Sequence, residues 1–217
     1  MRHMPMVLSC ALVTSIAAAI ATDAGAAVVG YWHCNGFDPD GSTTLAASMG
    51  NGTLDFTSFG TGATSLGGTD LNAQASVLAG DSLGLSGMSH NGAFAQIDLS
   101  TAGMADLSLS FATRRTATGF SNNRVEAWIG GSWTLVSTFS GPTTTWEVIT
   151  VDLSALNALE NGLASLRLVF DGATSGSGNI RIDNLTIEGS AVPVPGAVAL
   201  LGLAGVLGTR RRRAGAA

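Results

Sequence analysis

Apolar and polar residues alternate with a period of two through most of the middle of the chain. Leu107, Leu109 and Phe111 are separated by small or polar residues, and the same alternation recurs over 149–153 and 166–170. Successive side chains of a strand point to opposite faces, so each segment is predicted to be a half-buried strand. Further strands with apolar spacing are expected at Val28–His33, Thr53–Phe59, Ser82–Ser86, Ala93–Leu99, Arg124–Ile129, Trp133–Phe139 and Asn179–Glu188.

Turns rich in glycine separate these segments, and only Ser154–Leu159 has the pattern of one or two helical turns. Glycine supplies 29 of the 217 residues and charged residues only 12%, which suits short strands joined by polar turns. Many short strands without alternating helices predict an all-β fold, a β-sandwich. Residues 27–190 are long enough to form one such domain with its own core.

The last expected strand changes phase. Ile180 and Ile182 share one parity, whereas Leu185 and Ile187 share the other. A shift of one residue turns every later side chain to the opposite face, so a β-bulge is predicted near Asp183 and Asn184.

The N-terminal residues 1–26 have the pattern of a secretory signal peptide. A short start with Arg2 precedes an apolar stretch, and the small residues Ala24 and Ala26 occupy the two positions that a signal peptidase recognises. We therefore expect export and cleavage after Ala26 or Ala27.

The C-terminal segment 191–217 has three parts. The motif Val192-Pro193-Val194-Pro195-Gly196 precedes an apolar helix expected at 197–209, and the cluster Arg210-Arg211-Arg212-Arg213 follows. Residues 192–209 would span roughly 27 Å as a helix, about one hydrocarbon thickness. The arginines are expected to remain on the cytoplasmic side of the membrane.

This order, paired with a signal peptide, resembles the PEP-CTERM sorting signal of bacterial surface proteins. The resemblance implies that an exosortase-like enzyme cleaves near the motif, after transient insertion of the helix into the inner membrane. The protein would then lie on the cell surface or outside the cell. Val194 stands where the usual motif has Glu. The alternative is a plain C-terminal membrane anchor.

Charge narrows the choice of partners. Between Val28 and Ser190 there are five arginines against fourteen acidic residues, so the net charge of the domain is near −9. Such a domain repels phosphate backbones, and nucleic-acid binding is not expected. With Cys10 lost in the signal peptide, Cys34 is left alone. It is expected to be a buried apolar residue, with an intermolecular disulfide as the alternative.

Three segments of the second half resemble the closing strands of jelly-roll carbohydrate-binding modules. They are Asp152-Leu153-Ser154, Leu166 to Phe170 and Ile180 to Ile187. The resemblance implies a jelly-roll-like β-sandwich between the signal peptide and the sorting helix.

The same resemblance implies a structural calcium ion. In those modules an acidic residue of this last strand and a carboxylate near the N-terminus hold Ca²⁺, which here would be Asp183 with Asp38 and Asp40. Calcium takes six to eight oxygen ligands, which carboxylates, backbone carbonyls and water can supply. Alternatively, Asp38 and Asp40 only cap a turn and Asp183 faces solvent.

Aromatic residues give the remaining candidate site. Trp128, Trp133 and Trp146 cluster in the sequence, and exposed indole rings stack on sugars, although packing is the commoner use of Trp. His33 and His90 show no metal-ligand spacing, and no Gly-x-Ser-x-Gly elbow precedes an expected helix, so no enzyme is expected.

Two functions remain after these exclusions. The first is a structural or adhesive component of the envelope or of an extracellular polysaccharide matrix. The alternative is a glycan-binding jelly-roll module.

Overall fold

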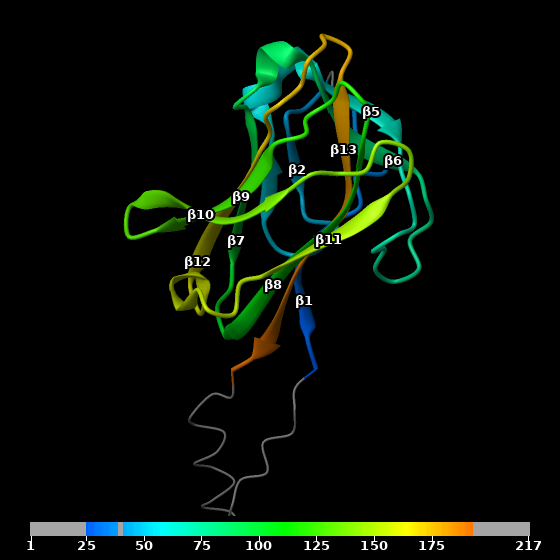
Figure 1. Cartoon of the computed structure of the whole chain (residues 1–217). Coiled ribbons are helices and arrows are strands. Elements are labelled where there is room, and N and C mark those ends of the chain that lie inside the picture. Colours follow the sequence, from blue (N-terminus) through cyan, green and yellow to red (C-terminus); the bar gives the residue numbers. More distant parts are fainter. Residues whose placement is uncertain (1–24, 39–40, 193–217) are drawn as a thin grey trace, which may run out of the picture. The chain divides into compact units, whose positions relative to one another are not determined.

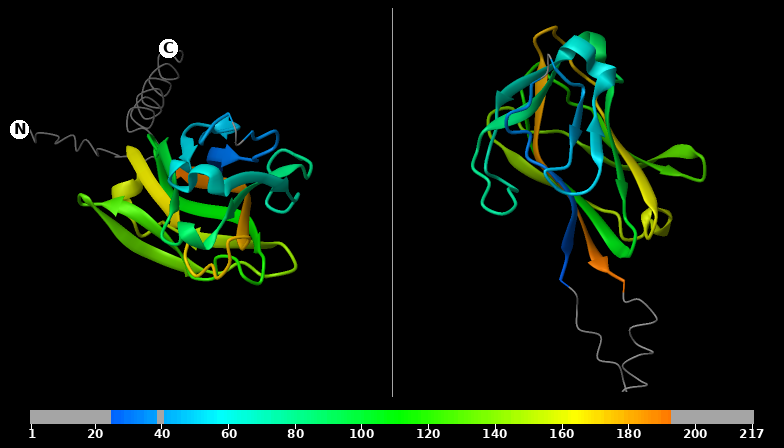
Figure 2. Two further views of the ribbon diagram at one scale, coloured as in Figure 1. Left: turned by 90° about the horizontal axis from the view of Figure 1, so that it is seen from above. Right: turned by 180° about the vertical axis from the view of Figure 1, so that it is seen from behind.

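A computed structural model describes residues 25–38 and 41–192, and this part is all-β, with two sheets packed face to face (Figures 1 and 2). No helix of the described residues is long and apolar enough to cross a membrane. Several sequence predictions lie outside the described residues. These are Ala24 and the signal peptide before it, Asp40, Pro193-Val194-Pro195, the expected sorting helix and Arg210 to Arg213.

The first sheet has seven strands in the order β11-β8-β13-β1-β3, with β6 also pairing with β13 and β5 with β6. The long bulged strand β13 lies at its centre, between β8 on one side and both β6 and β1 on the other. The strands of this sheet are β1 (Ala27–Trp32), β3 (Met49–Gly50), β5 (Ala63–Gly67), β6 (Asp81–Ser86), β8 (Met104–Arg115), β11 (Glu147–Asp152) and β13 (Asn179–Ala191).

The second sheet has six strands in the order β10-β9-β12-β7-β4-β2. Its strands are β2 (Thr44–Ala46), β4 (Thr53–Asp55), β7 (Phe94–Ser100), β9 (Asn123–Ile129), β10 (Ser132–Phe139) and β12 (Leu163–Val169). Three short 3-10 segments complete the described elements, η1 (Thr57–Gly62), η2 (Met88–His90) and η3 (Asn157–Leu159).

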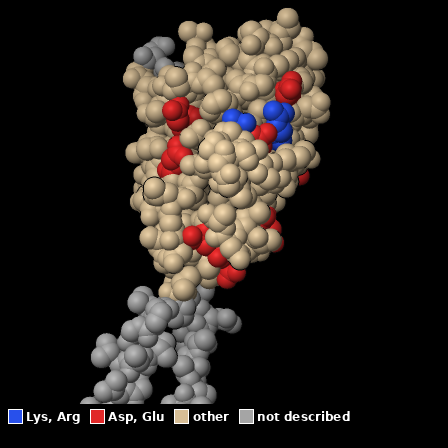
Figure 3. Space-filling view, turned by 90° about the vertical axis from the view of Figure 1, so that its left-hand side faces the viewer, with Lys and Arg blue, Asp and Glu red and all other residues tan. Residues whose placement is uncertain are grey.

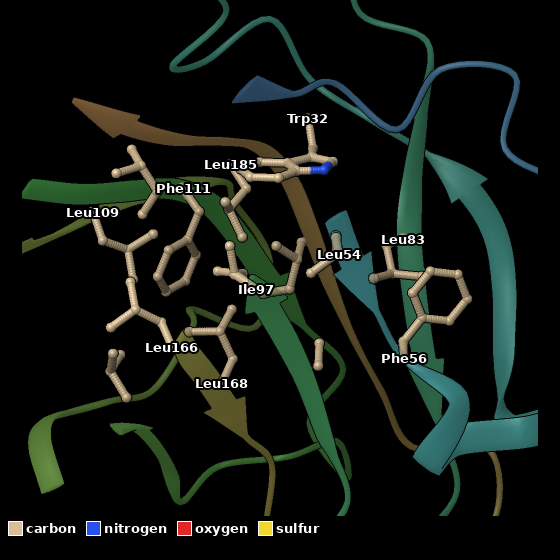
Figure 4. Packing of buried hydrophobic residues seen from close by; sticks show 14 of the residues in the cluster. Trp32, Leu54, Phe56, Leu83, Ile97, Leu109, Phe111, Leu166, Leu168 and Leu185 are labelled. Carbon is tan, nitrogen blue, oxygen red and sulfur yellow. The ribbon is translucent and has the colours of Figure 1, made fainter. Parts of the chain in front are cut away.

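The core lies between the two sheets, where the apolar residues of each alternation meet (Figure 4). Leu109 and Phe111 of β8 face Leu166 and Leu168 of β12, and all four side chains are at most 1% exposed. The period-two prediction of half-buried strands is confirmed for these segments, and with it the two-sheet β-sandwich.

The predicted bulge is also confirmed. The register of β13 against β8 shifts between Asp183 and Thr186, and Asn184 within it has φ of 48°. After the bulge, β13 pairs with β1 from Trp32↔Leu185 to Ala27↔Gly189, so the first and last strands are neighbours.

One strand prediction is wrong in part. Thr53–Phe59 was expected to be extended, but β4 ends at Asp55. The Asp55 carboxylate accepts a hydrogen bond of 2.7 Å from the Thr57 backbone N–H, an Asx-type turn that starts η1. The 3-10 turns then place both Phe56 and Phe59 in the core, fully buried, which a straight strand would not do. The helix expected at Ser154–Leu159 is the single short segment η3.

Candidate functional site

The outer face of the six-stranded sheet carries aromatic and charged side chains that alternate with core residues. In β9, Val125 and Ala127 are fully buried, whereas Trp128 is 46% exposed. Since neighbouring strand residues point to opposite faces, Trp128 faces outward.

Trp128 and Trp133 form a cross-strand pair on the β9–β10 hairpin, which projects from the body of the domain (Figure 1). Their ring centroids are 5.3 Å apart and the ring planes meet at 67°, an edge-to-face contact. The hairpin therefore carries two mutually braced indole rings.

Arg167 of β12 extends this aromatic pair across the sheet. Its guanidinium carbon lies 4.4 Å from the centroid of the Trp133 ring and 5.2 Å from that of Phe94 on β7. Contacts of this length are favourable cation–π interactions. Trp128, Trp133, Arg167 and Phe94 thus form a continuous strip over four strands, which we call the aromatic strip.

Glu126 fixes the position of Arg167. Its two carboxylate oxygens each lie 2.6 Å from a guanidinium nitrogen, one of Arg124 and one of Arg167. Burial alone would raise the pKa of Glu126, but hydrogen bonds and charge from Arg124 and Arg167 outweigh burial and hold the pKa below its ordinary value. Glu126 is therefore ionised and orients the guanidinium that supports the strip.

Polar groups of β7 lie beside Phe94 on the same face. The Gln96 side chain donates to the Asp98 carboxylate at 2.8 Å, and the Ser165 hydroxyl of β12 donates to the other Asp98 oxygen. Gln96 keeps an amide oxygen next to the strip as a hydrogen-bond acceptor.

A cleft of about 580 Å³ opens at the end of β9, and Arg124 belongs both to its lining and to the Glu126 ion pair. Asn123 and Asp171 shape it, because the Asn123 amide oxygen accepts the Asp171 backbone N–H. Figure 3 views the side of the domain from which the hairpin projects, and shows basic side chains gathered there with acidic ones around them. The cleft is lined by Ser121, Asn122, Asn123, Arg124, Thr138, Phe139, Ser140 and Asp171.

Trp146, the third predicted aromatic residue, lies in a different place. It directly precedes β11, which belongs to the seven-stranded sheet, and its ring faces Arg114 at 5.9 Å. The structure brings Trp128 and Trp133 together and separates Trp146 from them.

Asp183 is buried under the β5–β6 loop, residues 68–80. It is 1% exposed, so the alternative that it faces solvent is wrong. Its carboxylate accepts backbone N–H groups of Thr69 and Asn184, both at 2.8 Å. The pKa of Asp183 is raised to about 7, chiefly by burial and to a smaller degree by the charge of Asp81, against the lowering effect of these hydrogen bonds.

The described residues contain no group of three or more His, Cys, Asp or Glu side chains placed to hold a metal ion. Asp81 of β6 is the carboxylate whose charge acts on Asp183. Asp38 lies in a turn of its own, where its backbone carbonyl accepts the N–H groups of Gly41 and Ser42. Calcium held by Asp183 together with Asp38 and Asp40 stays a prediction.

Cys34 follows its expected role. It is 4% exposed and free, with φ of 55°, and burial raises the pKa of its thiol to about 12. The prediction of a buried small apolar residue is confirmed.

The site residues that sequence reasoning missed are Glu126, Arg167 and Phe94. A weak signal was present, because Arg124, Glu126 and Trp128 share one parity, as do Arg167 and Ser165 on β12. Their partnership depends on the register Arg167↔Glu126 between β12 and β9, which a single sequence does not give.

No protein-family model matches the chain, and no curated protein matches it. Among solved structures, the CBM22-1 xylan-binding domain from Paenibacillus barcinonensis Xyn10C is 15% identical, with a TM-score of 0.45 over 80% of this chain and 100% of that one. TmCBM61, solved with β-1,4-galactotriose, is 7% identical, with a TM-score of 0.40 over 58% and 81% of the two chains. The K2 cleaved adhesin domain of Lys-gingipain is 12% identical, with a TM-score of 0.39 over 70% and 92%.

Proposed function

We propose that the domain is a glycan-binding module that holds a saccharide chain on the outer face of its six-stranded sheet. The observation that carries the proposal is the aromatic strip. An indole ring offers a flat apolar face to the axial C–H groups of a pyranose, and Trp128 is nearly half exposed while its ring packs edge-to-face on Trp133.

The charges of this face favour a neutral sugar. Arg124 and Arg167 are both engaged by Glu126, and Asp98 adds a further carboxylate, so the face has no surplus of positive charge. Hydroxyl groups of a neutral saccharide can instead exchange hydrogen bonds with amide and carboxylate oxygens of this kind. The cleft that shares Arg124 extends the same surface beyond the end of β9.

We propose further that the module works outside the cell, on the envelope or in an extracellular polysaccharide matrix. The sequence of the two ends supports this, namely the Ala24-x-Ala26 site and the order of Pro-Val-Pro motif, apolar segment and arginines. Signal peptidase and an exosortase-like enzyme would process the protein, and a structural or adhesive role would follow from sugar binding.

A neutral glycan array probed with the full-length chain tests the proposal, followed by titration of the best glycan. We expect saturable binding that Trp128→Ala weakens at least about tenfold, which is a loss of about 1.4 kcal/mol. Trp146→Ala is the matched control, because it removes the same ring from the other sheet and should leave neutral binding unchanged. Equal effects of the two variants, or no saturable binding to any neutral glycan, would contradict the proposal.

A further inference from the structure

Two arginines lie directly opposite each other on the outer face of the seven-stranded sheet. Arg114 of β8 and Arg181 of β13 are register partners, and both alternate with buried residues such as Thr113 and Ile180. Side chains of directly opposed residues are about 5 Å apart at Cβ, and like charges in that position are destabilising. The fold therefore maintains a repulsive pair on an accessible face.

Neither arginine has an acidic partner among the described residues. The ion pairs found there are both formed by Glu126, on the other sheet. Arg181 donates to the Gly67 carbonyl at 3.0 Å, which positions it without neutralising it. Desolvation and the charge of Arg114 lower the pKa of Arg181, and the nearby Asp183 carboxylate is held by the Thr69 and Asn184 N–H groups.

Apolar side chains lie at both ends of this arginine pair. β11 pairs with β8 at Glu147↔Thr113, so Trp146 is placed beside Arg114, and its ring lies 5.9 Å from the guanidinium. On the other side Arg181 opposes Gly84 of β6, and Leu66 packs over the position where Gly84 lacks a side chain. Low-polarity neighbours strengthen the attraction of a cation pair for an anion.

We propose that Trp146, Arg114 and Arg181 form a second saccharide site, specific for an acidic sugar residue that carries a carboxylate or sulfate. The guanidinium groups would take the oxyanion in paired N–H···O bonds, and the sugar ring would lie against Trp146. A bound anion also relieves the repulsion between the two arginines. The site lies on the sheet opposite the aromatic strip, so one domain joins a neutral glycan to an acidic one.

Affinity electrophoresis of the full-length chain in polygalacturonate, dextran sulfate and neutral dextran tests the site. We expect retardation by the acidic polymers that Arg114→Gln or Trp146→Ala reduces at least about tenfold in affinity, the size of effect expected for one lost charge-assisted contact. Arg114→Lys should recover only part of it, because the charge returns without the planar fork.

Arg167→Gln is the matched control, since it removes the same charge from the other sheet. It should weaken neutral-glycan binding and leave acidic binding intact, so failure of this site and failure of the proposed function give different results. Thermal unfolding checks folding, and Arg114→Gln should melt no lower than the wild type because it removes a repulsive pair.

Three results would overturn the proposal. The first is equal loss of acidic binding in Arg114→Gln and Arg167→Gln, which would mean attraction by charge alone. The second is unchanged binding in both Arg114→Gln and Trp146→Ala. The third is that sodium sulfate displaces the acidic polymers as effectively as an oligogalacturonide does at equal charge. The site would then recognise any anion and not an acidic sugar.

Discussion

The ion pairs of Glu126 allow a quantitative prediction. Glu126→Gln keeps the shape of the side chain but removes the negative charge between two arginines. The amide can accept from one guanidinium only, and its NH₂ group would then face the other. The change therefore breaks one charge-assisted hydrogen bond and leaves Arg167 without a counter-ion.

The size of the stability loss follows from how exposed the three side chains are. The Arg167 side chain is 22% exposed and that of Glu126 10%, so this pair is largely desolvated, and its loss should cost about 1.5–2 kcal/mol. The Arg124 side chain is 39% exposed, and solvent screening reduces its share to about 0.5–1 kcal/mol. We expect the free energy of unfolding to fall by about 2–3 kcal/mol, or roughly 5–10 °C in melting temperature for a domain of this size.

The pH dependence has a definite sign. A carboxyl whose pKa is depressed by folding contributes stability that is present above its unfolded pKa and is lost as the pH falls through the folded value. The pKa of Glu126 is depressed, so its contribution should be complete at neutral pH, begin to fall below about pH 4 and disappear once the pH is below the folded pKa. The wild type and Glu126→Gln should therefore differ in stability at neutral pH and converge in acid.

Chemical denaturation measures the difference in the free energy of unfolding between the wild type and Glu126→Gln. It is carried out on the full-length chain at neutral and acidic pH and followed by tryptophan fluorescence. Glu147→Gln is the control, because it removes the same charge from an exposed residue without an ion pair among the described residues, and it should change stability by less than about 0.5 kcal/mol. Equal destabilisation by the two substitutions, or a Glu126→Gln effect that persists unchanged in acid, would refute the reasoning.

Three further predictions concern other parts of the chain. If Ca²⁺ binds at Asp183, millimolar Ca²⁺ should raise the melting temperature by roughly 5–10 °C over the value in chelator, and Asp183→Ala should abolish the rise. Identical melting of the wild type in Ca²⁺ and in chelator would exclude the ion. Native Cys34, with its raised pKa, should resist alkylation at about pH 8 and react after unfolding in guanidinium chloride, and rapid reaction of the native protein would show that the thiol is accessible. The intact mass of protein recovered outside the cell should lack Met1 and Arg210 to Arg213, and a full-length mass would rule out processing at both ends.

Local patterns predicted what depends on one strand at a time. Leu107, Leu109 and Leu166 were assigned to the core because alternation alone decides which face of a strand is buried. The bulge at Asp183–Asn184 was predictable for the same reason, because two apolar pairs of opposite parity in one strand require it.

Features that depend on pairing between distant strands could not be predicted in this way. Trp146 was grouped with Trp128 because they are close in the sequence. However, β9, which carries Trp128, and β11, which follows Trp146, belong to different sheets. The burial of Asp183 depends on the β5–β6 loop, which covers it from more than a hundred residues away through Thr69. The strand expected through Phe59 failed because a side-chain hydrogen bond of Asp55 ends β4.

The pairing of β1 with β13 has a mechanical consequence. Both strands leave the domain at the Ala27↔Gly189 end, and the hydrogen bonds of an antiparallel ladder run across the strands. A force that pulls the start of β1 away from the end of β13 therefore breaks the hydrogen bonds of this ladder in sequence, one pair after another. A force between the end of β13 and the sheet faces instead loads β13 along its length, where its bonds to β8, β1 and β6 must shear together. The domain should thus withstand a much larger force applied between the end of β13 and its sheet faces than one applied between the start of β1 and the end of β13.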